Sequence, residues 1–151
     1  MTIIAALFLI VIFYLVLRKY WGKNKWRKPQ EPFRPEWRII LVENVAFYNA
    51  LSKEEKARFE FKVQEFLLNC RITGIDTDVD VLDELLVASS AVIPIFEFIE
   101  WKYINLHEVL VYPGMFNDKF ETSGPDRRIL GMVGSGYMEG KMILSKERRL
   151  S

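Results

Sequence analysis

The 151-residue sequence contains only one cysteine, Cys70, and only one histidine, His107. A single cysteine excludes an intrachain disulfide and a zinc cluster built on several thiolates, which fits a reducing compartment. Catalytic zinc needs three protein ligands and an open position for water, so one imidazole without thiolate partners does not complete a metal site. The sequence therefore predicts no complete catalytic set, and no metal or other cofactor bound by these residues alone.

Outside the N-terminus, acidic residues outnumber basic ones. The formal net charge is +1, yet residues 1–28 hold six of the 21 lysines and arginines and no acidic residue. The remaining residues therefore hold 15 basic and 20 acidic side chains. A protein that binds nucleic acid needs a basic surface for the phosphates, so we expect no nucleic-acid partner.

The longest uncharged run spans residues 2–17 and is predominantly apolar. As a helix it would cover roughly 24 Å of a bilayer. Lysines and arginines follow the run instead of preceding it, which favours an uncleaved transmembrane anchor over residues 1–20. The same charge order predicts a single-pass protein of the inner (plasma) membrane whose C-terminal domain is cytoplasmic. The residues expected to contact membrane lipid at the interface are Arg18, Lys19, Tyr20, Trp21 and Lys23.

The rest of the chain has the length of one domain. Residues 21–33 are basic and proline-rich and predict a linker, and residues 34–151 follow as a single globular unit. Apolar residues recur at helical spacing through residues 36–51. Pro35 is suited to the first helical position, where its missing N–H costs nothing. A helix that begins at Pro35 is therefore predicted.

Two further helices are predicted after it. A capping box at residues 52–55 indicates the start of a helix that ends near Cys70. After a short break, Asp76 or Thr77 can cap a third helix over residues 79–93. This third segment is almost entirely apolar, so we expect it to be the central buried helix.

The second half of the sequence has the texture of strands. Residues 107–113 are rich in β-branched and aromatic side chains and end at a Pro-Gly pair, which predicts a strand. A polar loop follows, and the glycine-bearing residues 129–145 predict two short strands joined through turns. A helical subdomain followed by a small sheet of short strands indicates an α+β architecture behind the N-terminal transmembrane helix.

Two local patterns begin like metal sites but lack the donors that complete them. The pair His107-Glu108 opens like the zinc motif H-E-x-x-H, yet the position of the second histidine is a valine. Asp76, Asp78 and Asp80 have the opening spacing of a calcium loop, but its required glycine and glutamate are both replaced by valine. We interpret the histidine as structural or solvent-facing and the aspartates as helix caps and first-turn charges.

A cysteine and a histidine can also act as nucleophile and base. Here Cys70 lies on the apolar stripe of its predicted helix. A free cysteine in such a place usually behaves as a small hydrophobic residue. We therefore interpret Cys70 as part of the core and not as a nucleophile activated by His107.

The order of segments in the second half is similar to that of a known family. An apolar helix ending LLVASSAVIPIF is followed by HEVLVYPGMF, a polar loop, a glycine turn and GKMILS. Over about residues 34–146 this order resembles the zinc-dependent peptidases of the Mlc titration factor A family, also called glucose-regulated metallopeptidases. The resemblance implies that residues 107–116 match a signature segment. It also implies that residues 142–145 match the strand before a catalytic helix carrying H-E-F-x-H.

That catalytic helix would begin beyond Ser151, so the resemblance transfers no catalytic residue and implies a truncated zincin-like domain, with zinc expected only for the complete family domain. It implies a membrane-anchored N-terminal portion of a zinc-dependent metallopeptidase that supplies scaffold and substrate groove. The alternative is a non-catalytic, membrane-tethered protein-interaction module. A truncated product and an inactive remnant both remain open. The implied partners are a peptide or protein substrate, or a transcriptional repressor. The expected groove wall consists of His107, Glu108, Tyr112, Pro113 and Gly114.

Overall fold

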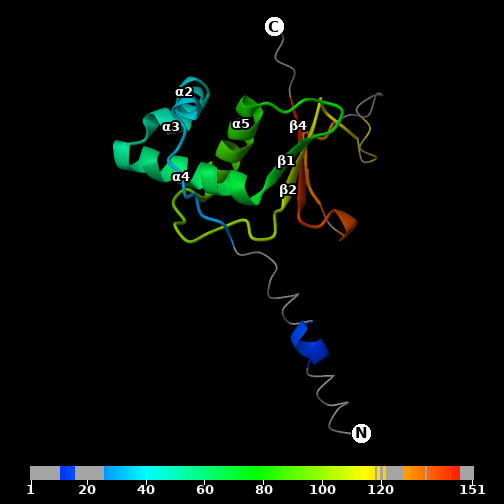
Figure 1. Ribbon diagram of the computed structural model, residues 1–151. Helices are drawn as coiled ribbons and strands as arrows, with labels where there is room; N and C mark the ends of the chain where they lie inside the picture. Colours follow the sequence, from blue (N-terminus) through cyan, green and yellow to red (C-terminus); the bar gives the residue numbers. More distant parts are fainter. Residues whose placement is uncertain are drawn as a thin grey trace.

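The computed structural model describes residues 11–15, 26–117, 119, 121, 128–134 and 136–146. The four α-helices between residues 35 and 92 lie on one side of a four-stranded sheet, which makes an α+β domain, and residues 11–15 form a separate helical stretch (Figure 1). The helices are α2 (Pro35–Asn44), α3 (Ala46–Ala50), α4 (Lys53–Asn69) and α5 (Val81–Val92), with 3-10 turns η1 (Ile93–Ile95) and η2 (Gly136–Met138). The strands are β1 (Arg71–Gly74), β2 (Glu108–Tyr112), β3 (Gly131–Val133) and β4 (Lys141–Ser145).

The predicted transmembrane helix is not found among the described residues. In the part of the chain that the structure describes, no helix has both the length and the apolar character needed to cross a membrane. The prediction of an N-terminal transmembrane helix, and with it the single-pass inner-membrane location, is therefore wrong. Of the predicted anchor, the structure describes residues 11–15, which are helical and cover about 7.5 Å, whereas a spanning helix needs about 20 residues. The predicted lipid-contacting residues Arg18, Lys19, Tyr20, Trp21 and Lys23 lie outside the described residues.

Capping boxes begin the two longest helices. At α4, Ser52 Oγ accepts from the Glu55 amide at 3.3 Å and Glu55 Oε2 accepts from the Ser52 amide at 2.8 Å, which confirms the predicted box. At α5, Asp80 and Asp83 make the same exchange at 2.9 and 3.1 Å. The predicted caps at Asp76 or Thr77 are wrong because only Asp80 has an acidic partner three residues later that returns the hydrogen bond.

The first predicted helix is divided into α2 and α3. Val45 stands between them with an extended backbone, φ −119° and ψ 92°, and its side chain is buried. Two asparagine side chains satisfy carbonyls at the break: Asn44 Nδ2 donates to Ile40 O at 2.9 Å, and Asn49 Nδ2 donates to Val42 O at 2.7 Å. Side-chain amides thus replace helical hydrogen bonds, which lets the chain turn here.

The sheet is mixed, with the strand order β1-β2-β4-β3. β2 is central and runs parallel to both β1 and β4, while β3 is an edge strand antiparallel to β4. Ile72 pairs with Val109, and Val109 pairs with Met142, so all three side chains point to one face. β1 was not predicted, because four residues ending in glycine carry too little alternation to be distinguished from a turn.

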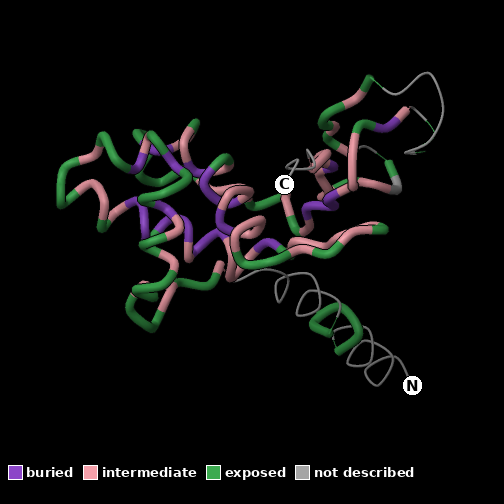
Figure 2. The backbone as a smooth tube through the Cα atoms, turned by 90° about the horizontal axis from the view of Figure 1, so that it is seen from above, coloured by how far each residue is buried: buried purple, intermediate pink, exposed green. Residues whose placement is uncertain are grey.

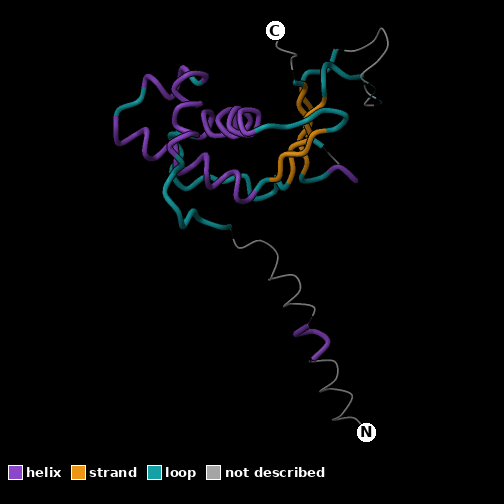
Figure 3. The backbone as a smooth tube through the Cα atoms, turned by 45° about the horizontal axis from the view of Figure 1, so that its top comes forward, coloured by secondary structure: helices purple, strands orange, loops and turns teal. Residues whose placement is uncertain are grey.

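Alternate residues of β2 contribute to two separate cores. Val109 and Val111 face the helices, whereas Leu110 packs with Ile143 and Phe116 on the opposite face. Buried segments concentrate in the helical half (Figure 2), and α2 to α5 gather on one side of the strands (Figure 3). The helix-side core includes the fully buried side chains Leu41, Tyr48, Phe59, Val63, Leu85, Val92 and Phe96.

Candidate functional site

A large cleft lies where the three parallel strands end. Parallel strands place their carboxyl ends at one edge of a sheet, and open sheets commonly bind ligands there. The cleft has a volume of about 760 Å³. Its walls come from the loop after β1, from the first three turns of α5, and from the ends of β2 and β4. This topology brings together residues that are about 70 positions apart, from Asp76 to Lys146.

The polar rim of the cleft is acidic and contains one lysine. Lys146 Nζ donates to Asp83 Oδ2 at 2.5 Å and to the carbonyl oxygen of Asp78 at 3.2 Å. The hydrogen bond to Asp83 raises the pKa of Lys146 above its usual value. The hydrogen bond from the backbone amide of Asp83 lowers the pKa of Asp80. The Lys146 ammonium and the Asp80 carboxylate are therefore both charged at neutral pH. Asp76 stands at the rim with a left-handed backbone, φ 54°.

A second, smaller pocket of about 480 Å³ lies at the other end of the parallel strands, where β1, β2 and β4 begin. Glu108 accepts from Thr73 Oγ1 at 2.8 Å and pairs with Lys141 Nζ at 3.3 Å. These contacts, led by the threonine hydrogen bond, lower the pKa of Glu108. Gly140 has φ 80°, and a Cβ there would lie 2.9 Å from His107 Cδ2, so only glycine fits against this imidazole.

The structure does not bring the five predicted groove residues together. His107 and Glu108 line the smaller pocket, while Pro113 lines the larger cleft. The smaller pocket and the larger cleft lie at the two ends of β2, roughly 17 Å apart at about 3.3 Å per residue. Tyr112 packs on Phe116, ring centroids 5.4 Å apart, on the face away from the helices. That His107, Glu108, Tyr112, Pro113 and Gly114 contact a substrate stays a prediction.

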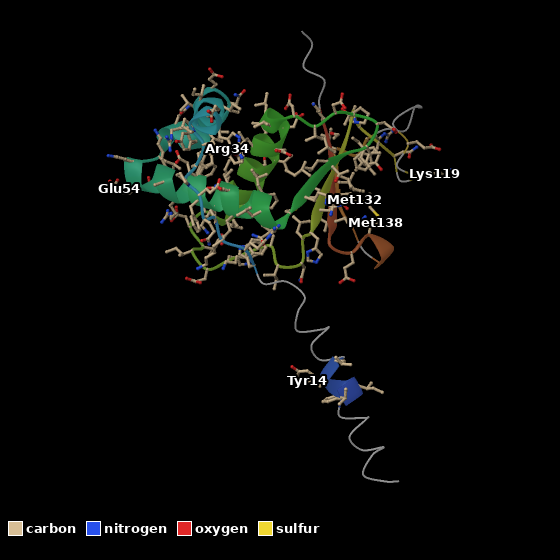
Figure 4. The ribbon with its side chains drawn as sticks, viewed as in Figure 1. Tyr14, Arg34, Glu54, Lys119, Met132 and Met138 are labelled. Atoms are coloured by element: carbon tan, nitrogen blue, oxygen red, sulfur yellow. The ribbon has the colours of Figure 1, made fainter. Side chains whose placement is uncertain are left out.

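The far face of the sheet is covered by a small cluster that includes methionines. Met132 and Met138 lie on the side of the strands away from α2–α4 (Figure 4), where they pack around Leu110, Phe116 and Ile143. Neither the larger cleft nor the smaller pocket opens into this cluster. The larger cleft and the smaller pocket thus lie at the two ends of the parallel strands and apart from this cluster.

Cys70 is buried and lies 3% exposed at the C-cap of α4. Burial, aided by the nearby charge of Glu108, raises the pKa of its thiol to about 12. We therefore expect iodoacetamide at pH 8 to modify the folded chain about 100-fold more slowly than the urea-unfolded chain, because the thiolate is the reactive form. Mass spectrometry of timed samples measures both rates, and equal rates would contradict the buried position.

Sequence reasoning missed the pairing of Lys146 with Asp83, although both residues line the larger cleft. Asp83 lies within the predicted, almost entirely apolar third helix and was assigned no role from the sequence. No local pattern connects it to a lysine 63 positions later. The only usable signal was that a basic residue follows directly after the last predicted strand, where it must emerge beside the other parallel strand ends.

Residues 18–150 match the sequence model of the glucose-regulated metallo-peptidase family M90. The chain belongs to this metallopeptidase family. An uncharacterized protein from Synechocystis sp. is 32% identical over 130 residues, which are 83% of this chain and 46% of that protein. This member of the metallopeptidase family thus spans about half the length of the curated relative that it matches. The predicted family resemblance is confirmed.

Zinc suits a metallopeptidase family, but the described residues of this member do not fit a zinc site by themselves. Within them no group of three or more His, Cys, Asp or Glu side chains is placed so that it could hold a metal ion. A catalytic zinc requires three protein ligands. At the rim of the larger cleft, Asp80 caps α5 and Asp83 binds Lys146. No reaction step through zinc follows from these residues.

Proposed function

We propose that residues 34–146 form the scaffold and substrate-groove part of a zinc-dependent metallopeptidase domain, with the zinc ligands supplied from outside this segment. The observation that carries the proposal is the family match over residues 18–150, which includes the whole sheet. The matched segment is 46% of the relative's length, which leaves room for ligands elsewhere in such a protein. Within the described residues, no group of three or more His, Cys, Asp or Glu side chains is placed so that it could hold a metal ion, which agrees with ligands supplied from elsewhere.

The sheet supports substrate binding by its edges and not by its centre. β2 is paired on both sides, so its backbone cannot pair with a peptide. A substrate backbone can add as a strand to β1 or to β3, which are the two edges. Under this proposal His107, Glu108 and Pro113 contact substrate side chains at the two ends of β2, and the strand edges hold the substrate backbone.

The proposal predicts a chain without catalytic activity of its own. Isothermal titration of the purified 151-residue chain with zinc is expected to show no stoichiometric site of submicromolar affinity, because three protein ligands are needed. Incubation with casein and zinc is expected to give no chelator-sensitive cleavage. A catalytic zinc site within this chain would be revealed by cleavage that a chelator abolishes and added zinc restores, and that result would overturn the proposal.

Reading the coding DNA beyond codon 151 gives the matching positive test. An H-E-x-x-H motif there, joined in frame to this chain, is expected to yield a protein that hydrolyses casein with zinc. Replacing the glutamate of that motif by glutamine should abolish the cleavage while zinc still binds, since that glutamate activates water. Absence of the motif would favour the second candidate function.

The second candidate is a non-catalytic protein-interaction module, and one observation favours it. Four large apolar side chains are exposed in the segment after η1: Phe98 by 63%, Ile99 by 65%, Trp101 by 48% and Ile104 by 61%. Exposed apolar patches often mark protein-binding surfaces. Lys62 Nζ donates to the carbonyl oxygens of Phe98 and Ile99, both at 3.3 Å, and so holds the beginning of this segment against α4. Under this reading a transcriptional repressor would be the partner.

A further inference from the structure

We propose that the larger cleft binds a lysine-bearing, otherwise apolar peptide segment of another polypeptide, with the lysine ammonium at the acidic rim and the neighbouring aliphatic side chains on the cleft wall. The proposal goes beyond the peptidase function and does not depend on it. It rests on the lining of the cleft, on the charge of its rim, and on the lysine of this chain that already occupies the rim.

The cleft wall is apolar and accessible. Leu82, Leu86 and Val87 of α5 face Val111 of β2 and Leu144 of β4 across a volume of about 760 Å³. All of them except Val111 are only partly buried. Peptide side chains of the size of leucine can therefore cover surface that is now in contact with water, which favours binding by about 25 cal/mol per Å² of apolar area.

The rim carries an excess of negative charge. Asp76, Asp80 and Asp83 line the cleft, and Asp78 lies in the same loop with its carbonyl oxygen directed at Lys146. Lys146 is the only cation among the residues that line the cleft in the described part of the chain. The rim therefore complements a positively charged ligand.

Lys146 shows how the rim holds an ammonium group. Its Nζ lies 2.5 Å from Asp83 Oδ2 and 3.2 Å from Asp78 O, so a carboxylate and a carbonyl oxygen converge on one nitrogen. This residue follows directly after β4, and its side chain reaches the first turn of α5. A lysine from a partner would find the same kind of acceptors, and Lys146 would compete with it.

The start of α5 does not turn the cleft into an anion site. The amide of Asp83 donates to the Asp80 carboxylate, and the amide of Asp80 donates to the Asp83 carboxylate. Amide groups that a phosphate would need are therefore already used, and two carboxylates repel an anion. The charge of the rim thus selects a cationic ligand.

The binding test uses the full 151-residue chain and two rhodamine-labelled peptides, acetyl-Ala-Leu-Lys-Leu-Ala-amide and its counterpart with glutamate in place of lysine. Fluorescence anisotropy is expected to show binding of the lysine peptide, and at least tenfold weaker binding of the glutamate peptide. Lys146→Met keeps the aliphatic stem but removes the competing ammonium, so it is expected to strengthen binding of the lysine peptide about fivefold.

Rim charges are removed with variants that keep the local backbone. Asn tolerates the left-handed backbone of Asp76 and caps helices as well as Asp80 does, so Asp76→Asn/Asp80→Asn is expected to fold. This variant should bind the lysine peptide about tenfold more weakly. The matched control, Glu36→Gln/Glu43→Gln, removes two charges from α2, away from the cleft, and should bind as the unchanged chain does.

Three results would overturn the proposal. Equal affinity for the lysine and glutamate peptides would exclude recognition of the ammonium, and equal affinity of the rim and control variants would exclude the acidic rim. If the lysine peptide bound only when Arg148→Gln/Arg149→Gln was introduced, the chain's own terminal residues would be the occupant. Circular dichroism of each variant confirms that the fold is retained.

Discussion

Replacing Phe59 by alanine is expected to lower the free energy of unfolding by about 4 kcal/mol, because it removes a large buried ring and leaves a cavity. Phe59 is 0% exposed. Its ring lies 5.7 Å from that of Phe47 and 5.8 Å from those of Tyr48 and Phe96, centroid to centroid. These contacts join α3, α4 and the residue after η1. Urea denaturation followed by circular dichroism measures the loss.

Phe61→Ala is the matched control, since Phe61 lies two positions further along α4 and is 43% exposed. Removing the same ring from this half-exposed position is expected to cost no more than about 1 kcal/mol. The difference between the two variants isolates the contribution of burial from the helix propensity that both changes share. Losses of similar size would show that Phe59 is not in the core of the folded chain.

Glu60→Ala is expected to lower the free energy of unfolding by about 3 kcal/mol. Arg38 donates to both carboxylate oxygens of Glu60 at 2.7 and 2.8 Å, and the Tyr48 hydroxyl donates to one of them at 2.5 Å. Without the carboxylate, the buried tyrosine hydroxyl loses its acceptor. The expected loss is below the upper end for buried ion pairs, because the Arg38 side chain is 49% exposed and can be solvated.

The same carboxylate makes stability depend on acid. Hydrogen bonding from Arg38, and then from Tyr48, holds the pKa of Glu60 below its ordinary value of 4.5. The folded chain therefore binds fewer protons here than the unfolded chain, so this contribution is present above pH 4.5 and is lost as the pH falls through the folded pKa. Urea midpoints measured below pH 4.5 should fall less steeply for Glu60→Gln than for the unchanged chain.

Glu43→Ala provides the comparison for Glu60→Ala, because Glu43 is an exposed acid of α2. It is expected to change the free energy of unfolding by no more than about 0.5 kcal/mol. A Glu60→Ala variant as stable as Glu43→Ala would show that the three-residue network contributes nothing. Tyr48 offers a further check, since burial and Glu60 raise the pKa of its hydroxyl to about 12.

Strong local signals predicted the elements that carry them. The Ser52 capping box is present as predicted, and the strand predicted over residues 107–113 is found at Glu108–Tyr112, because caps and runs of β-branched residues are local signals. The break at Val45 and the strand β1 were not predicted. The break involves a hydrogen bond from the Asn49 side chain to Val42 O, which apolar periodicity does not reveal, and β1 depends on pairing with the distant strand β2.

The candidate site was harder to predict than the fold. The signature His107–Phe116 suggested one groove wall, but the two ends of a strand lie at opposite ends of the sheet. Of the five predicted groove residues, only Pro113 lines the larger cleft. Asp76, Asp78 and Asp80 were interpreted as helix caps and first-turn charges, and the structure places Asp80 at the N-cap of α5. Their convergence with Lys146 depends on the parallel arrangement of β1, β2 and β4, which no local pattern encodes.

The central place of β2 has a consequence for synthesis on the ribosome. Its two partners lie far away on either side, since Glu108 pairs with Arg71 before it and with Lys141 after it. As the chain emerges, β2 can pair with β1 and pack against α5. The backbone amides and carbonyls of β2 that later pair with β4 then still lack hydrogen-bond partners. An open apolar strand invites pairing with other nascent chains. The interval between emergence of residues 112 and 141 is therefore when this polypeptide most needs a chaperone.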